Sequence, residues 1–171
     1  MARDGTPMDQ NYLYTLAFIK HNDEILMLNR NKAPWFGMWN GVGGKRDKGE
    51  SPEDCIRREI AEETGIVVTP EQIRFRGTLS WNDVFVAASS GLYLYFVELD
   101  DASPDPTPVG TGEGILDWKK ITWIVDPRNL GVAYNIPTFL PALIGDDRTY
   151  HYHCIFEGNR LVSVETTPLK M

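Results

Sequence analysis

The fold of this chain is indicated by one stretch, Gly44 to Ile66, which reads GKRDKGESPEDCIRREIAEETGI. Ser51 is a residue type that caps the first turn of a helix, and Pro52 suits the first helical position because its missing N–H would be unpaired there. Gly65 gives the matching stop, since glycine accepts the left-handed conformation in which many helices end. We therefore expect a helix between Pro52 and Gly65.

Three carboxylates crowd one face of this predicted helix. At about 100° per residue, Glu59, Glu62 and Glu63 fall within an arc of roughly 100° beside an apolar stripe. Like charges three and four residues apart destabilise a helix, and Arg58 alone cannot neutralise three acids. Hard divalent cations such as Mg²⁺ or Mn²⁺ prefer oxygen ligands, so a cation is expected here. The alternative is a solvated acidic face without a ligand.

Length, composition and charge restrict the class of protein. The 171 residues are 42% hydrophobic and 24% charged, so we expect one globular domain over 12–171 after a flexible N-terminus at 1–11. Lys and Arg total 17 against 24 Asp and Glu, and the net charge of −7 disfavours a long nucleic acid as partner. No apolar run approaches the roughly 18 residues of a membrane span, so we expect a cytoplasmic protein without a membrane partner. Cys55 and Cys154 are expected to be free thiols.

Strand patterns dominate the rest of the chain. We expect a hairpin around His21-Asn22-Asp23, a second hairpin around Glu157-Gly158-Asn159 and one further helix over 135–144. Surface loops are expected over 31–44 and 100–112. The expected strands are 12–20, 24–28, 72–81, 91–99, 115–124, 150–156 and 160–165. This pattern predicts an α/β protein in which helices pack on the faces of a mixed sheet.

The acidic helix belongs to a longer motif. Gly44, five residues, Glu50, seven residues and then Arg58 to Ile66 match in full the Nudix box, G-x5-E-x7-R-E-U-x-E-E-x-G-U, where U is bulky and aliphatic. With seven fixed positions, chance agreement is on the order of 10⁻⁸ per starting point. The chain therefore resembles the Nudix hydrolases, and in particular their MutT-like members that act on 8-oxo-dGTP. The resemblance implies an α/β/α sandwich and hydrolysis of a nucleoside diphosphate linked to another group.

Carried over position by position, the resemblance implies a metal site on the box helix. Glu59, Glu62 and Glu63 would hold Mg²⁺, for which Mn²⁺ is a substitute, and the backbone carbonyl of Gly44 would supply another ligand. The metal would neutralise the polyphosphate and activate the attacking water.

Two further roles follow from the same resemblance. Arg58 and Glu50 would brace the helix against the loop that precedes it. Glu62 or Glu63 would position or deprotonate the attacking water, although the family does not use one invariant base.

Candidates for substrate recognition lie outside the motif. The run that ends in Asn40-Gly41-Val42-Gly43-Gly44-Lys45 resembles MutT-type and mammalian sanitising members, which makes the Asn40 amide and Lys45 candidate substrate contacts. Asn135, in the tripeptide Asn-Ile-Pro, resembles the base-reading Asn of bacterial MutT, and an amide can match a lactam edge because it both donates and accepts. A turn residue at Asn40 and a helix N-cap at Asn135 explain these positions equally well. Mammalian members carry an adjacent Asp pair where this chain has Asn135 and Ile136.

Two charged residues complete the candidate site. Glu113 precedes Trp118 by five residues, where MutT-like proteins often place an extra acidic metal ligand or base; a solvated loop residue is the alternative. Arg30 ends a predicted strand, and its guanidinium can fork onto two phosphate oxygens. An exposed strand-end charge is the alternative for Arg30.

The function expected from the sequence is Mg²⁺-dependent conversion of a nucleoside triphosphate, with 8-oxo-dGTP as the first choice, to the monophosphate and pyrophosphate. A nucleotide sugar, a dinucleoside polyphosphate or the 5′ end of RNA are alternative substrates. A catalytically silent module that senses a nucleotide is an alternative of another class. The expected partners are a small nucleotide and, because the family is often dimeric, a second copy of the chain.

Overall fold

The computed structural model describes residues 11–82, 91–100 and 107–169. Most of the N-terminal segment expected to be flexible, residues 1–10, lies outside the described residues, as does the part of the 100–112 loop at 101–106. Within the described ranges, no helix is both long enough and apolar enough to cross a membrane.

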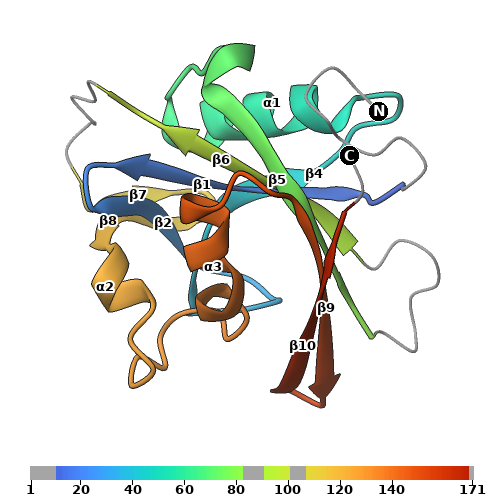
Figure 1. The fold of residues 1–171 in the computed structure, drawn as a ribbon. Helices are drawn as coiled ribbons and strands as arrows, with labels where there is room; N and C mark the ends of the chain where they lie inside the picture. The colour runs from blue at the N-terminus through green and yellow to red at the C-terminus, as the bar shows by residue number, and fades with distance from the viewer. Residues whose placement is uncertain (1–10, 83–90, 101–106, 170–171) are drawn as a thin grey trace.

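The described strands form one ten-stranded mixed sheet (Figure 1). The hydrogen-bonded order is β10-β9-β5-β6-β1-β2-β8-β7, with β3 paired to β2 and β4 paired to β1. Two neighbouring pairs, β1 with β6 and β5 with β9, run parallel, and the other pairs are antiparallel. The strands are β1 (Tyr14–His21), β2 (Glu24–Arg30), β3 (Trp39–Asn40), β4 (Val42–Lys45), β5 (Ile73–Trp81), β6 (Gly91–Glu98), β7 (Val109–Thr111), β8 (Gly114–Lys120), β9 (Tyr150–Glu157) and β10 (Arg160–Pro168).

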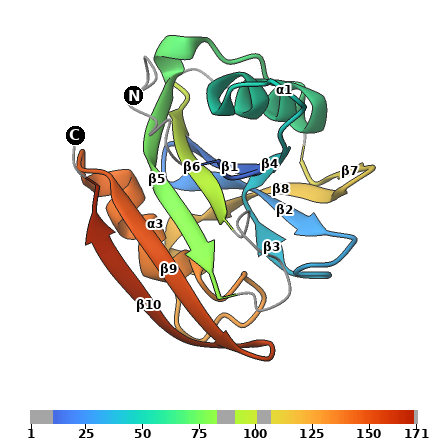
Figure 2. The ribbon, with the colours of Figure 1, turned by 90° about the vertical axis from the view of Figure 1, so that its right-hand side faces the viewer.

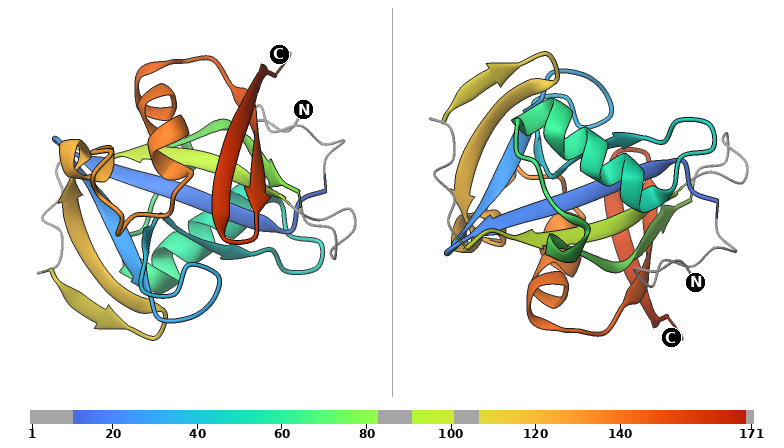
Figure 3. Two further views of the ribbon diagram at one scale, coloured as in Figure 1. Left: turned by 90° about the horizontal axis from the view of Figure 1, so that it is seen from below. Right: turned by 90° about the horizontal axis from the view of Figure 1, so that it is seen from above.

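Helices cover both faces of this sheet, as Figures 2 and 3 show. Helix α1 (Pro52–Thr64) packs on one face, and α3 (Ile136–Gly145) packs on the other. Each face has its own apolar core, because successive side chains of the central strands point to opposite sides. Phe18 joins the core beneath α3, whereas its neighbour Ile19 joins the core beneath α1. The expected α/β/α sandwich is confirmed.

The start and end of α1 follow the sequence signals. The Ser51 side chain accepts a hydrogen bond from the backbone N–H of Asp54 at 3.1 Å, which satisfies one of the free donors of the first turn. Gly65 ends the helix with φ 74°, in the left-handed region that glycine enters without a steric cost. Ile56 and Ile60 are fully buried, so the apolar stripe faces the sheet. This orientation leaves the carboxylate face of α1 beside the loop that precedes the helix.

Several loop and strand predictions were wrong in detail. The predicted loop over 31–44 contains β3 and most of β4. The two-residue strand β3 pairs with β2, and β4, whose glycines have little strand propensity, pairs with β1. In the predicted loop over 100–112, Val109–Thr111 pairs with β8. The predicted strand over 115–124 ends at Lys120, because its partner β2 begins at Glu24, opposite Lys120, and offers no further residue. The last four residues form the short helix α2 (Ile121–Ile124) instead.

Both predicted hairpins are confirmed: β1 pairs with β2 and β9 pairs with β10. Both cysteines are free and buried. Cys55 lies on α1, with its sulfur 3.3 Å from the Thr15 hydroxyl oxygen, whereas Cys154 lies in the core beneath α3. The two thiols are therefore on opposite faces of the sheet.

The capping contact of Ser51 gives a first prediction. Ser51→Ala removes the acceptor for the Asp54 N–H and is expected to lower the free energy of unfolding by about 1 kcal/mol in urea titrations. Ser51→Thr keeps an acceptor and is expected to stay closer to the unchanged protein. Ser163→Ala, at an exposed position of β10, is the matched control. Equal losses for Ser51→Ala and Ser163→Ala would show that the cap does not hold the helix.

Candidate active site

The site lies where the sheet divides beside α1. One edge of β1 is shared by two partners, because Tyr14 to Ala17 pair with β4 while Ile19 to His21 pair with β2. The strands β4 and β2 therefore diverge, and α1 packs against β4 and β1. This arrangement brings the end of β4, the acidic face of α1 and the end of β2 to one region of the molecule.

An ion pair ties α1 to the preceding loop. Arg58 donates from Nε and Nη2 to the two carboxylate oxygens of Glu50, at 2.8 and 2.9 Å. Glu50 also accepts a hydrogen bond from the backbone N–H of Asp47, and its backbone carbonyl accepts two hydrogen bonds from Arg46. The hydrogen bonds from Arg58 hold the pKa of Glu50 at about 2, so the pair stays charged throughout the physiological pH range. The predicted brace is thus a two-point contact, the strongest geometry for such a pair.

The same guanidinium faces two of the predicted metal ligands. Arg58 Nη1 lies 2.7 Å from Oε1 of Glu59 and 3.2 Å from Oε2 of Glu62. The Glu59 carboxylate lies so close to Gly44 that a Cβ on Gly44 would be 2.5 Å from the carboxylate carbon. A side chain at Gly44 would therefore displace this carboxylate from its place, which fits the fixed glycine of the motif. Burial raises the pKa of Glu59 in spite of the neighbouring Arg58.

Glu63 is the most perturbed carboxylate of the site. Burial raises its pKa to about 8, and the charges of Glu59 and Glu113 add to the shift, whereas Arg30 opposes it. Its Oε2 is buried without a hydrogen-bond partner among the described residues. A buried carboxylate oxygen without a partner is costly, so this atom needs a proton or a bound cation. The metal role predicted for Glu63 fits this environment.

Glu113 and Arg30 come to the same region from the neighbouring strands. Arg30 pairs with Gly114 across β2 and β8, and the backbone N–H of Asn31 donates to the carbonyl of Glu113 at 3.1 Å. The Glu113 carboxylate lies 2.6 Å from Nζ of Lys32. Since Glu113 and Arg30 both shift the pKa of Glu63, the structure brings these two predicted residues next to α1. Lys32 is a neighbour that no sequence motif marks.

The three predicted substrate-recognition residues outside the motif make contacts within the protein itself. The Asn40 side-chain oxygen accepts from the next backbone N–H, of Gly41, at 2.8 Å, as in a turn. Asn135 occupies the N-cap position of α3, as the alternative explanation expected, but its side chain makes no capping bond; its amide donates instead to Cys154 Sγ at 3.8 Å. The Lys45 carbonyl accepts from Arg58 and its side chain is exposed. Substrate contacts of these three residues stay predictions.

The candidate metal ligands are oxygen atoms, which hard divalent cations prefer. The candidate ligands are carboxylates, one with an unpartnered buried oxygen, together with the backbone carbonyl of Gly44. As the side chains stand, no group of three His, Cys, Asp or Glu residues in the described part of the chain is already gathered for an ion. Glu59 and Glu62 face Arg58 instead. The residue types fit Mg²⁺ or Mn²⁺, with Glu63 as the residue most in need of a cation.

The family comparison agrees with this site. A model of the NUDIX domain matches residues 13–137. This chain belongs to the Nudix hydrolase family. The matched residues run from β1 to the start of α3 and include the whole motif on α1, whereas the β9–β10 hairpin lies beyond them.

Named hydrolases and a MutT protein are among the relatives and solved structures that this Nudix protein resembles. An oxidized purine nucleoside triphosphate hydrolase of Mus musculus is 30% identical over 58% of this chain and 62% of its own length. The uncharacterized Nudix hydrolase YvcI of Bacillus subtilis is 29% identical over 70% of each chain. A MutT protein from Bacillus halodurans superposes with a TM-score of 0.68 at 24% identity, covering 90% of this chain and 95% of its own. The chain spans less than two thirds of the mouse relative.

The burial of Glu63 predicts how stability depends on pH in the metal-free protein. The folded pKa of about 8 exceeds the ordinary value of 4.5, so the folded state binds more protons than the unfolded state between these values, and stability falls as pH rises through this window. Glu63→Gln removes this penalty, and its gain in unfolding free energy is expected to be about 4 kcal/mol larger at pH 8.5 than at pH 5.

The measurement is urea unfolding in EDTA at both pH values. Glu62→Gln is the matched control, because the Glu62 side chain is 59% exposed and loses little hydration on folding. If Glu63→Gln changed stability equally at both pH values, the burial assigned to the Glu63 carboxylate would be wrong.

Proposed function

We propose that this Nudix protein hydrolyses a phosphoanhydride bond of a nucleotide with the help of a divalent cation. The observation that supports this most strongly is the buried Glu63 carboxylate, which has an unpartnered oxygen and lies near Glu59, Glu113 and Arg30. Such a cluster of acids is stable only with protons or cations, and phosphate groups are the ligands that share a divalent ion with carboxylates. The alternative of a silent sensing module offers no reason to keep these acids together.

The division of labour among the residues follows from their positions. A bound Mg²⁺ or Mn²⁺ would supply charge neutralisation at the polyphosphate and acidify a bound water. Glu59, Glu63 and the Gly44 carbonyl would hold the ion, with Glu62 and Glu113 as further carboxylates. Arg58 and Glu50 keep α1 and its loop in register, so they position these groups without touching the substrate.

The reaction is a substitution at phosphorus. A water oxygen forms a bond to the attacked phosphorus, the bond between that phosphorus and the bridging oxygen breaks, and the water proton passes to Glu62 or Glu63. The products are a nucleoside monophosphate and pyrophosphate when the substrate is a nucleoside triphosphate. Arg30, at the end of β2, binds a phosphate oxygen in this scheme.

For the substrate, 8-oxo-dGTP is our first choice. Asn135 lies at the start of α3, and Asn40 lies on β3. An amide pair of this kind can read the lactam edge of an oxidised guanine. The relative named an oxidized purine nucleoside triphosphate hydrolase supports this choice. We further propose that the protein acts in the cytoplasm, binds no long nucleic acid and forms a homodimer.

The reaction class is tested with a panel of phosphorylated nucleotides in Mg²⁺. We expect pyrophosphate release from a nucleoside triphosphate, and a loss of about 100-fold or more in kcat for Glu63→Gln. Glu165→Gln, at an exposed position of β10, is the control and should keep full activity. The panel includes a nucleotide sugar, a dinucleoside polyphosphate and a 5′-triphosphate RNA, and turnover of one of these alone would replace our substrate choice. No turnover of any member would overturn the proposed hydrolase.

The role of Asn135 is tested by substrate preference. In Asn135→Ala the amide that reads the oxidised edge is lost, so the ratio of kcat/KM for 8-oxo-dGTP over dGTP should fall about tenfold or more. Activity on dGTP serves as the internal control, because a folding defect would lower both rates together. An unchanged ratio would remove Asn135 from base recognition.

A further inference from the structure

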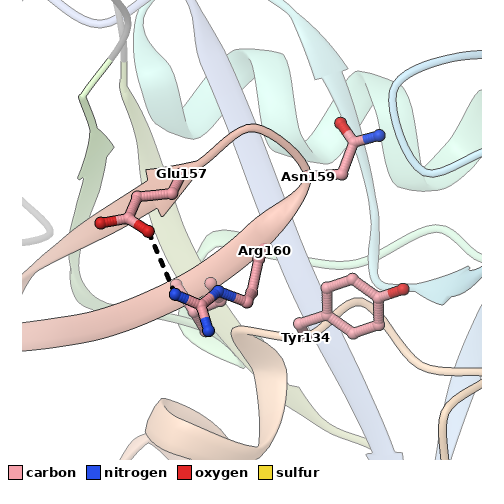
Figure 4. A pocket seen from close by; sticks show the side chains of 5 residues that line it. Tyr134, Glu157, Asn159 and Arg160 are labelled. Carbon is pink, nitrogen blue, oxygen red and sulfur yellow. Dashed lines mark hydrogen bonds and ion pairs between the residues drawn. The ribbon is translucent and has the colours of Figure 1, made fainter.

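A hollow of about 630 Å³ lies between the start of α3 and the tip of the β9–β10 hairpin (Figure 4). Its volume is within the range of sites that hold small organic ligands. None of its lining residues belongs to the motif on α1, and the hairpin lies beyond the residues that the family model matches. The lining side chains are Tyr134, Glu157, Asn159, Arg160 and Leu161.

The walls of this hollow are fixed by contacts behind them. The Trp35 ring packs edge-on against Tyr134, with 5.3 Å between ring centroids, and also contacts Phe156 on β9 at 6.0 Å. Asn82 clamps the hairpin, because its side chain donates to the Phe156 carbonyl at 3.0 Å and accepts from the Phe156 N–H at 2.7 Å. A ligand would therefore meet walls that are already ordered, which lowers the entropy cost of binding.

The chemistry of the lining suits a neutral planar molecule. Tyr134 is 43% exposed and offers an aromatic ring, and Leu161 adds apolar surface. The Asn159 amide can both donate and accept hydrogen bonds. Arg160 is paired with Glu157 at 3.0 Å, so the two opposite charges offset each other and the hollow has no net charge to attract a polyphosphate. A nucleobase with its ribose has the required combination of apolar faces, polar edges and hydroxyl donors.

Two chain segments connect the hollow to the candidate active site. Tyr134 directly precedes Asn135, the candidate base-reading amide. Trp35, behind Tyr134, lies on the connection from Arg30 at the end of β2 to β3. The segment before Tyr134 runs beside β3, because the Trp39 N–H donates to the Gly131 carbonyl and the Ala133 N–H donates to the Trp39 carbonyl. Arg30 itself reaches this wall, because its Nε donates to the carbonyl of Pro34 at 2.7 Å, directly before the Trp35 that packs on Tyr134.

We propose that this hollow binds one face of the base and the ribose of the substrate: Tyr134 stacks on the base, the hairpin tip contacts the ribose, and the edge of the base is directed to Asn135, the next residue in the chain. The β9–β10 hairpin then sets nucleoside specificity from outside the motif that sets the reaction. This inference rests on the proposed function for the identity of the ligand, but its binding test needs neither metal nor turnover.

The binding test uses dGMP as the probe, in EDTA, with intrinsic tryptophan fluorescence as readout because Trp35 contacts Tyr134. Tyr134→Leu is expected to raise the Kd about tenfold, whereas Tyr134→Phe keeps the ring and should stay within about twofold. Inorganic pyrophosphate should not displace the probe. Equal affinity of the unchanged protein and Tyr134→Leu, or displacement of dGMP by pyrophosphate, would overturn the proposal.

The hairpin is tested separately, because its tip residues are exposed and their replacement spares the core. Arg160→Ala combined with Asn159→Ala is expected to raise KM about fivefold or more for a nucleoside triphosphate while kcat stays the same. Arg128→Ala is the matched control: Arg128 is also an exposed arginine paired with a neighbouring acid, Asp126, but lies outside the hollow.

The failures of the two proposals can be told apart. A protein that binds dGMP through Tyr134 but hydrolyses nothing would contradict the hydrolase and keep the nucleoside site. A protein that hydrolyses nucleotides with the same KM in the Tyr134 and hairpin variants would keep the hydrolase and contradict the nucleoside site.

Discussion

The contact between Arg58 and Glu50 is the constraint on which the site depends. Helix α1 carries more negative charge on one face than its own basic residues can balance, and Arg58 faces two of these acids, Glu59 and Glu62, together with Glu50 of the preceding loop. Because the pair with Glu50 is made through two hydrogen bonds, the guanidinium is fixed in direction as well as in position. The end of β4, which carries Gly44, is held beside the helix because Arg58 also donates to the Lys45 carbonyl, so the spacing of the motif reflects a geometric requirement.

The divided edge of β1 gives this loop its place in the fold. A strand that pairs with two partners along one edge forces these partners apart. The residues beside the point where they diverge come from β2, from β4 and from β8, which pairs with β2. Arg30 and Glu113 reach the face of α1 for this reason, although they are distant from it in sequence. Burial in this region favours the protonated form of Glu63, whereas a bound cation favours the ionised form, so proton and cation binding oppose each other there.

Much of this could be predicted from the sequence, and the failures have physical causes. The limits of α1 were predictable because Ser51 and Gly65 act locally on backbone hydrogen bonds. The strand β4 was missed because its two glycines have little strand propensity, and β3 was missed because it is only two residues long; pairing with β1 and β2 decides their conformation. Asn135 had two explanations because asparagine serves both as a helix cap and as a base-reading amide. Only the direction of the side chain in the folded protein distinguishes the two roles. The hollow at Tyr134 had no sequence signal, since its walls are joined by contacts between distant segments.

The positions of the two thiols make them natural reporters of motion in this molecule. Cys55 is buried on the α1 side of the sheet, where burial raises its pKa to about 11, and Cys154 is buried on the α3 side, where burial also raises its pKa. Since the thiolate is the reactive form, a thiol reagent can modify either residue only when its layer opens. The alkylation rates of Cys55 and Cys154 would therefore report separately how often the α1 layer and the α3 layer open, without any introduced label.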